Sequence, residues 1–241
     1  MKIPFTAFWL AVLFSFQAAA QNTALLPMPR DFPTNWMARH EANVAEAKKG
    51  GIDLLFLGDS ITDGWRWGNG GSKLWPQLYA PRHAANFGIG YDRIQNVLWR
   101  VENGELENIH PKVVVLLIGT NNTGNEDNGL PRNSPPEIIE GVTAIVKDLR
   151  VKLPESKVLL LAIFPRGQTN DPVRVQLKEV NAGLAKLDDG KMVKFLDLGA
   201  KFLDSDGTLA RDIFPDLLHP NEKGYQIWAD AMEGALAEMM K

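Results

Sequence analysis

The hydrophobic residues of this chain fall into five short apolar runs, separated by longer segments with helical spacing. The runs are rich in leucine, valine, isoleucine and phenylalanine, and together they show little polar alternation. This pattern is typical of strands buried on both faces of a parallel sheet. The five predicted strands cover Ile52–Leu57, Ala84–Phe87, Val113–Ile118, Val158–Phe164 and Val193–Leu198.

The intervening segments carry apolar residues every three or four positions, which predicts amphipathic helices. The first runs from Thr34 to a Gly50-Gly51 stop, and the others cover Asp92–Val101, Pro135–Val151, Val173–Leu187 and Glu222–Met240. Strands and helices that alternate in this way predict a doubly wound fold. We therefore expect one α/β domain over residues 34–241, a three-layer α/β/α sandwich with a five-stranded parallel sheet.

The N-terminus has the pattern of a secretory signal. Lys2 precedes an apolar run from Ile3 to Phe16, and small residues at Ala18–Ala20 offer a cleavage site. An uncleaved membrane anchor is the alternative, but the run is shorter than the roughly 20 residues that a spanning helix needs. We expect residues 1–20 to be a signal peptide, with export to the periplasm or medium. Residues 21–33 contain three prolines and no periodic pattern, which predicts an extended leader.

The composition of the chain excludes several kinds of site. The 241 residues are 45% hydrophobic, carry a formal net charge of -3 and include no cysteine. Without cysteine the chain has no disulfides, thiolate nucleophile or cysteine-ligated metal. The acidic balance gives no sign of the basic face that a nucleic-acid binder needs.

Polar motifs follow the predicted strands. GDS follows the first strand, NFGIGYD belongs to the second, GTNN follows the third and FPRG the fourth, while DLLHP precedes the last helix. Ligands of open α/β sheets bind at the carboxyl ends of the strands. We therefore expect one active site built from these loops.

Ser60 is the candidate nucleophile, since it lies in a turn that leaves a strand and enters a helical segment. A serine there can turn its hydroxyl to the cleft and its backbone N–H to a developing oxyanion. The same residue can also be an ordinary helix N-cap. The motif is not G-x-S-x-G, so it does not indicate the nucleophile elbow of the α/β-hydrolases.

His219 is the candidate base, because the other histidines, His40, His83 and His110, fall away from the expected cleft. Asp216, three residues earlier, is close enough to accept a hydrogen bond from Nδ1 of His219 and leave Nε2 for the serine proton. The alternatives are that His219 begins a helix and that Asp216 is a solvated turn residue. Two other aspartates, Asp206 and Asp212, fit the spacing less well.

Other residues of these loops are candidates for the oxyanion or for substrate. The side-chain amide of Asn121 can donate to an oxyanion, although asparagine is also common in turns. Aromatic residues beside the loops can form either a core or a ligand platform. We predict substrate contacts from Asp59, Gly90, Asn122, Trp65 and Phe164.

The motifs resemble those of the GDSL-type (SGNH) hydrolases, and most closely the platelet-activating-factor acetylhydrolase subgroup. The similarity runs through GDSIT, NFGIGYDRIQNVLWRVENGELENIHPKVVVLLIGTNN, FPRG and DLLHP. It implies the flavodoxin-like SGNH fold, Ser60 as nucleophile, His219 as general base and Asp216 as its orienting acid. It also implies oxyanion donors at the Ser60 N–H, the Asn121 side chain and the N–H of Tyr91, where the family has glycine.

These observations predict a secreted serine esterase that removes short acyl groups, acetyl above all, without a metal or cofactor. Acetylated carbohydrates are the expected substrates, and lipid esters such as lysophospholipids use the same machinery. A non-catalytic carbohydrate-binding protein on this fold is an alternative that the intact motifs disfavour. The expected partner is a glycan or small-molecule ester. We expect no nucleic acid and no stable membrane anchor, and a homodimer is left open.

Overall fold

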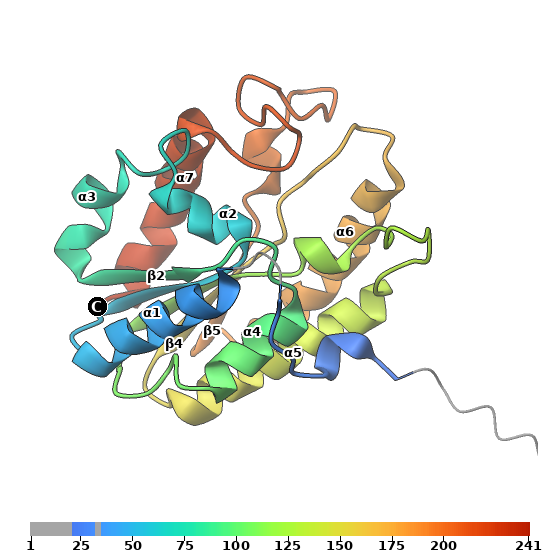
Figure 1. The fold of residues 1–241 in the computed structure, drawn as a ribbon. Helices are drawn as coiled ribbons and strands as arrows, with labels where there is room; N and C mark the ends of the chain where they lie inside the picture. The colour runs from blue at the N-terminus through green and yellow to red at the C-terminus, as the bar shows by residue number, and fades with distance from the viewer. Residues whose placement is uncertain (1–20, 32–34) are drawn as a thin grey trace, which may run out of the picture.

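The computed structural model describes residues 21–31 and 35–241, and it contains the predicted five-stranded parallel sheet (Figure 1). The strand order is β2-β1-β3-β4-β5, and every pair is parallel. The strands are shorter than the apolar runs, because residues such as 162–164 stay buried after leaving the sheet. They cover β1 Leu54–Gly58, β2 Ala84–Gly88, β3 Val113–Leu117, β4 Lys157–Leu161 and β5 Val193–Leu196.

Helices cover both faces of the sheet, which confirms the three-layer α/β/α architecture. One layer consists of α1 Trp36–Lys49, α4 Ile94–Glu102, α5 Pro135–Lys152 and α6 Pro172–Leu184. The other face is covered by α7 Glu222–Met239 and the region of the short helices α2 Ser60–Asp63 and α3 Trp75–Leu78. Single turns of 3-10 helix lie at Thr23–Leu25, Gly64–Arg66, Ala80–Arg82, Thr120–Asn122, Ala185–Leu187 and Gly199–Phe202.

The two hydrophobic cores explain why the strands lack polar alternation. Leu55 and Leu57 of β1 face the core under α4 and α5, whereas Leu54 and Phe56 face the core under α7. Both sets of side chains are fully buried. A strand that is covered on both faces therefore needs apolar residues at every position.

The strand order places the expected site at a topological switch point. From β1 the chain first moves outward to the edge strand β2, then returns across β1 to β3 on its other side. Connections that leave neighbouring strands in opposite directions open a crevice at their carboxyl ends. Ser60 follows β1 and the Thr120–Asn122 turn follows β3, so both lie at this crevice.

The segment after residue 20 differs from the extended leader that the sequence predicts. Asn22 accepts a hydrogen bond from the N–H of Ala24, which caps the turn Thr23–Leu25. Ala24 is fully buried, and a Cβ added to Gly141 of α5 would lie 3.0 Å from its Cβ. The segment therefore docks on α5, because this cap and this close approach fix a turn that no apolar periodicity signals.

The predicted signal peptide, residues 1–20, lies outside the described residues, as do residues 32–34. Within the described part of the chain, no helix has both the length and the apolar character that crossing a membrane requires.

Candidate active site

The end of β1 and the start of α2 present Ser60 to the crevice. Asp59 is the N-cap of α2, and its Oδ1 accepts a hydrogen bond from the N–H of Ile61 at 3.0 Å. Gly58 permits the close approach of the neighbouring strand, because a Cβ there would lie 2.2 Å from the carbonyl oxygen of Leu117. The G-D-S sequence thus combines a tight strand contact, a helix cap and the candidate nucleophile.

Ser60, His219 and Asp216 come together as the sequence predicts. The Ser60 Oγ lies 2.9 Å from Nε2 of His219, and Nδ1 of His219 lies 2.7 Å from Oδ2 of Asp216. Oδ1 of Asp216 also accepts the backbone N–H of Leu218 at 3.0 Å and of His219 at 2.7 Å. With Asp216 accepting from Nδ1–H, Nε2 is left as the acceptor that faces the serine hydroxyl.

The Asp216 carboxylate is suited to orienting a histidine because it stays ionised. Partial burial alone would raise its pKa, but hydrogen bonds from the backbone and ring of His219 outweigh burial and lower the pKa. The ionised carboxylate can therefore stabilise a positive imidazolium when His219 takes up a proton.

The loop that carries His219 is fixed at both ends. Leu217 has φ 60, in the left-handed region, and its carbonyl accepts the N–H of Gly167 from the FPRG loop at 2.9 Å. Asn221 caps α7 by accepting from the N–H of Lys223 and Gly224. The start of α7 and the loop after β4 thus hold the histidine at the crevice.

The loop after β2 passes beside Ser60. A Cβ added to Gly90 would lie 4.0 Å from the Ser60 Cβ, at ordinary van der Waals distance, so the backbone of Gly90 lies close to the serine. Tyr91 adopts φ 67, a left-handed conformation that favours glycine, and its side chain is 55% exposed. The backbone therefore keeps a glycine-type conformation while the ring points away from the core.

Asn121 connects the loops after β2 and β3. Its Nδ2 donates to the carbonyl of Asp92 at 2.9 Å, which leaves the second amide hydrogen for another acceptor. The bond fixes the direction of the Asn121 amide, and the role of Asn121 as an oxyanion donor stays a prediction.

Four of the predicted substrate contacts have side chains that the structure buries, which does not favour direct contact with a substrate. Trp65 packs among aromatic rings of the α7 core, and Phe164 packs against Phe202 and Trp228. Asn122 binds the N–H of Ile94 and the side chains of Gln95 and Asn133, and Asp59 is the buried cap of α2. Residues directly after a strand still lie between the layers, so proximity to the cleft in sequence does not expose them. Gly90, in the loop after β2, lies beside Ser60, and Asp59 directly precedes Ser60 in the chain with its carboxylate buried.

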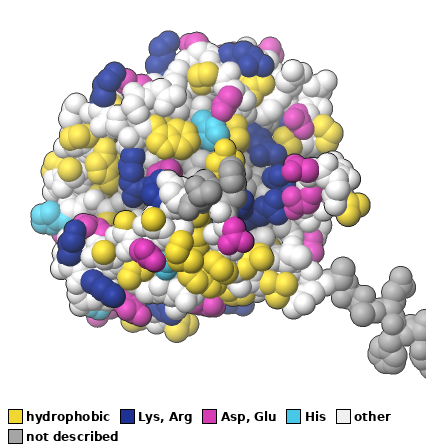
Figure 2. All heavy atoms as spheres, viewed as in Figure 1, with side chains coloured by type: hydrophobic (Ala, Val, Ile, Leu, Met, Phe, Trp, Pro, Cys, Tyr) yellow, Lys and Arg dark blue, Asp and Glu magenta, His cyan; other side chains and the backbone are white. Residues whose placement is uncertain are grey.

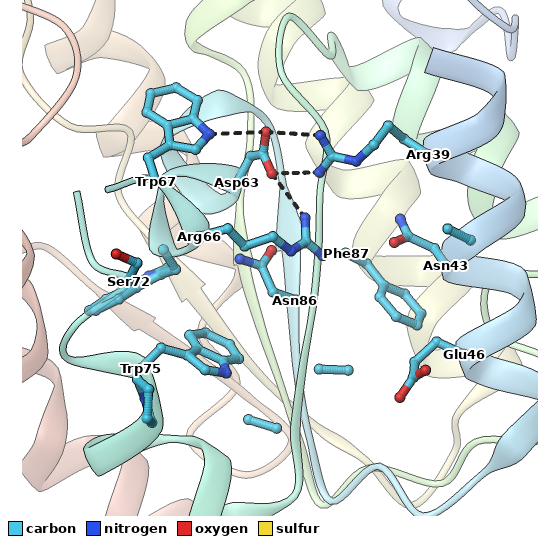
Figure 3. A pocket seen from close by; sticks show the side chains of 15 residues that line it. Arg39, Asn43, Glu46, Asp63, Arg66, Trp67, Ser72, Trp75, Asn86 and Phe87 are labelled. Carbon is cyan, nitrogen blue, oxygen red and sulfur yellow. Dashed lines mark hydrogen bonds and ion pairs between the residues drawn. The ribbon is translucent and has the colours of Figure 1, made fainter. Parts of the chain in front are cut away.

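Asp63 binds Trp67, which packs on His219, an arrangement that the sequence analysis did not single out; Figure 3 shows the contacts of Asp63. The Asp63 carboxylate accepts hydrogen bonds from Arg39 at 2.6 Å, Arg66 at 2.9 Å and the indole N–H of Trp67 at 3.3 Å. The Trp67 ring packs on His219, with 5.3 Å between ring centroids. The i,i+4 spacing of Asp63 and Trp67 after GDS was the available signal.

A buried ion network lies behind the same loops. Arg100 binds the carboxylates of Asp92, at 2.8 Å, and of Glu105, and all three side chains are fully buried. It also donates to the carbonyl of Gly58 at 3.2 Å and of Phe87 at 3.0 Å. One guanidinium group therefore ties together the ends of β1 and β2 and the residue that follows Tyr91.

Among residues 21–31 and 35–241, no group of three or more His, Asp or Glu side chains is placed to hold a metal ion.

A sequence model described as the GDSL-like lipase/acylhydrolase family matches residues 56–227, which include Ser60, Asp216 and His219. The chain belongs to this family. Membership of this family explains both the fold and the motifs at the strand ends. It also identifies the chain as an ester hydrolase.

Known relatives cover most of the chain. Human platelet-activating factor acetylhydrolase IB subunit alpha1 is 36% identical over 206 residues, which are 85% of this chain and 84% of that protein. The acetyl xylan esterase AlAXEase has a similar structure, with TM-score 0.60, 26% identity and coverage of 77% of this chain and 100% of that one. A GDSL-like lipase from Bacteroides thetaiotaomicron shares the fold, with TM-score 0.65, 18% identity and coverage of 85% and 98%.

Proposed function

We propose that this protein is a serine esterase that removes short acyl groups, acetyl above all, from alcohols. The observation that carries the proposal is the chain of contacts from Ser60 Oγ through the His219 ring to Asp216, with distances of 2.9 and 2.7 Å. This is the arrangement that a serine needs for attack on an ester carbonyl, because an adjacent base must take its proton.

The reaction runs in two steps. His219 takes the proton of Ser60 as its Oγ attacks the carbonyl, and then returns it to the departing alcohol. Water, activated by the same histidine, hydrolyses the acyl-enzyme. The oxyanion accepts hydrogen bonds from the Ser60 and Tyr91 N–H groups and from Asn121. Every step uses residues of the chain and water.

The names of similar proteins support acetyl as the group that is removed and a carbohydrate as the substrate. One similar protein is named as a platelet-activating factor acetylhydrolase and another as an acetyl xylan esterase, so the two names share acetyl as the group removed. The signal-like segment at residues 1–20 favours the carbohydrate, because exported enzymes meet extracellular glycans. Lipid esters are the competing substrate class, since fold and triad do not choose between them.

The first test is hydrolysis of p-nitrophenyl acetate, butyrate and octanoate by the protein without residues 1–20. Rates should fall with acyl length and vanish for Ser60→Ala, whose fold is checked by circular dichroism. Release of acetate from acetylated xylan is then compared with release from a 2-acetyl phospholipid. Equal rates with the three esters would contradict the short-acyl proposal, and an active Ser60→Ala variant would contradict the serine mechanism.

Export is proposed on the same segment and has its own test. Expression of the full chain in a bacterial host should give a periplasmic or medium fraction whose N-terminus begins near Gln21. An intact N-terminus in the cytoplasmic fraction would refute export and leave the esterase proposal untouched.

A further inference from the structure

The carboxylate that orients His219 is open to solvent. The side chain of Asp216 is 55% exposed, and that of His219 is 27% exposed. Water competes for both partners of an exposed ion pair or hydrogen bond, so such a contact fixes geometry only weakly. The bond from Nδ1 of His219 to Oδ2 of Asp216, at 2.7 Å, is therefore by itself a weak hold on the ring that must face Ser60.

A second contact to the His219 ring comes from Trp67. The two ring centroids lie 5.3 Å apart, with 58° between the ring planes. The histidine thus has a carboxylate at Nδ1, the serine hydroxyl at Nε2 and an indole packed against it. Figure 2 shows histidine side chains at the surface of the viewed face, one of them next to hydrophobic and acidic side chains.

The backbone of Trp67 is fixed by the turn that follows α2. Trp67 is the C-cap of the turn Gly64–Arg66, and its N–H donates to the carbonyl of Gly64 at 3.1 Å. Its own carbonyl accepts the N–H of Gly70 at 2.9 Å. Hydrogen bonds on both sides of the residue therefore hold in place the Cα from which the indole projects.

Asp63 holds the direction of the indole. Nε1 of Trp67 donates to Oδ2 of Asp63 at 3.3 Å (Figure 3). The same carboxylate is bound by Arg39 at 2.6 Å and by Arg66 at 2.9 Å. The Asp63 side chain is only 6% exposed. The support of the Trp67 ring is therefore buried, whereas the Asp216 carboxylate on the other side of the histidine is exposed.

One short helix connects the candidate nucleophile to this support. Ser60 begins α2 and Asp63 ends it. The two arginines that bind Asp63 also donate to the carbonyl of Gly88 at the end of β2, Arg39 at 3.3 Å and Arg66 at 3.1 Å. The helix that carries the serine and the carboxylate that directs the indole therefore form one anchored unit.

We propose that Trp67 is a positioning residue for His219, directed by Asp63, and that its ring stabilises the imidazolium formed during the reaction. The inference rests on the proposed esterase function and deepens it, because it gives the histidine of that mechanism a second support. An indole suits this role because the face of its π-system attracts a cation. The contact is stronger once His219 has taken the proton of Ser60, so it favours the transition state over the ground state.

The first test compares the wild type with Trp67→Leu and Trp67→Phe in the hydrolysis of p-nitrophenyl acetate. Trp67→Leu removes the ring and should lower kcat about tenfold with little change in KM, because the contact strengthens in the transition state. Trp67→Phe keeps an aromatic face and should restore kcat to within about threefold of the wild type. Thermal unfolding checks that each variant is folded at the assay temperature.

The matched control is Trp75→Leu, which removes another indole from the wall of the same cavity. The Trp75 ring packs on Phe56, with 5.1 Å between centroids, and on Tyr79, with 5.2 Å. The control should lower Tm and leave kcat unchanged at a temperature where it is folded. A fall in kcat as large as that of Trp67→Leu would assign the effect to lost packing in the cavity and refute the proposal.

A double-mutant cycle tests the part of Asp63. Asp63→Asn weakens the acceptor of the indole N–H and should lower kcat. In a Trp67→Phe background, which has no indole N–H, the same substitution should have a smaller effect, because residues that act through one contact are not additive. Equal falls in the two backgrounds would show that Asp63 does not act through Trp67.

Proton NMR gives a readout that does not depend on turnover. The Nδ1–H of His219 should give a low-field resonance in the wild type and in Trp67→Phe, identified by its loss in His219→Gln. In Trp67→Leu the resonance should broaden through exchange with water, because the exposed Asp216 then holds the ring without the indole.

The outcomes separate the two proposals. If the wild type hydrolyses the ester and Trp67→Leu keeps its kcat and its resonance, the positioning role is refuted and the esterase proposal stands. A fall in kcat that phenylalanine does not restore, with an unchanged resonance, also refutes the role. If folded wild-type protein hydrolyses none of the p-nitrophenyl esters, the esterase proposal fails and this inference fails with it.

Discussion

Arg100→Met tests how strongly the buried ion network holds the site together. The substitution keeps the side-chain volume but leaves Asp92 and Glu105 without their cation, and both carboxylates are fully buried. Burial alone would lower the pKa of Arg100, but the attraction of Glu105 and Asp92 raises it, so the guanidinium is charged at every relevant pH. Removal of one partner from a buried ion pair costs about 3–5 kcal/mol.

The structure sets the expected magnitude near the lower end of that range. After the substitution Glu105 still accepts a hydrogen bond from Asn43 at 3.0 Å, and Asp92 still accepts one from Trp36 at 2.6 Å. For a domain of this size each kcal/mol shifts Tm by about 2–4 °C, so Arg100→Met should lower Tm by roughly 6–12 °C. The value is read from thermal unfolding at neutral pH.

The same variant should lose activity while it is still folded. Arg100 donates to the carbonyls of Gly58 and Phe87, which begin the loops of the nucleophile and of Tyr91. The kcat for p-nitrophenyl acetate should therefore fall at 15 °C, well below the unfolding transition. The matched control is Arg82→Met, which breaks a half-exposed pair with Glu233 and should shift Tm by less than about 3 °C. Equal Tm shifts for the two variants would refute the reasoning.

Three further predictions concern the loops around Ser60. Asn121→Ala should lower kcat for p-nitrophenyl acetate by about 10²–10³-fold with little change in Tm, because it removes one oxyanion donor. An unchanged kcat would show that Asn121 does not have that role. Tyr91→Gly should keep the left-handed backbone at φ 67 and broaden the range of acyl lengths that the enzyme accepts. Tyr91→Val should lose activity, because a β-branched residue is strained in that conformation. An unchanged acyl-length profile for Tyr91→Gly would show that the Tyr91 ring does not limit acyl length. Burial raises the pKa of Asp59 to about 7, so the folded protein binds a proton there that the unfolded chain releases near pH 4. Stability should therefore fall as pH rises from about 4 to 7, and Asp59→Asn should flatten this dependence in urea unfolding curves; a parallel pH dependence in the variant would show that other groups dominate.

The fold could be predicted from the sequence because its signals are local. Each strand is a run of apolar residues, since both faces of the sheet are covered, and each long helix has a regular apolar stripe. What the sequence did not predict is the docked turn at Thr23–Leu25, which depends on the contact of Ala24 with Gly141 of α5. Such a contact between residues more than a hundred positions apart leaves no periodic pattern near either residue.

The residues of the candidate site also divide into those with a local signal in the sequence and those without one. Ser60, Asp216 and His219 could be predicted because the chain has only four histidines, Asp216 lies three residues before one of them, and Ser60 directly follows a buried strand. The aromatic residues could not be sorted, because Trp65 and Trp67 are two positions apart in one motif and lie in different environments. The turn Gly64–Arg66 sends the Trp65 ring into the core and the Trp67 ring onto His219. Only the direction of each side chain distinguishes Trp65 in the core from Trp67 on His219, and the direction of Trp67 is held by the hydrogen bond from its indole N–H to Asp63.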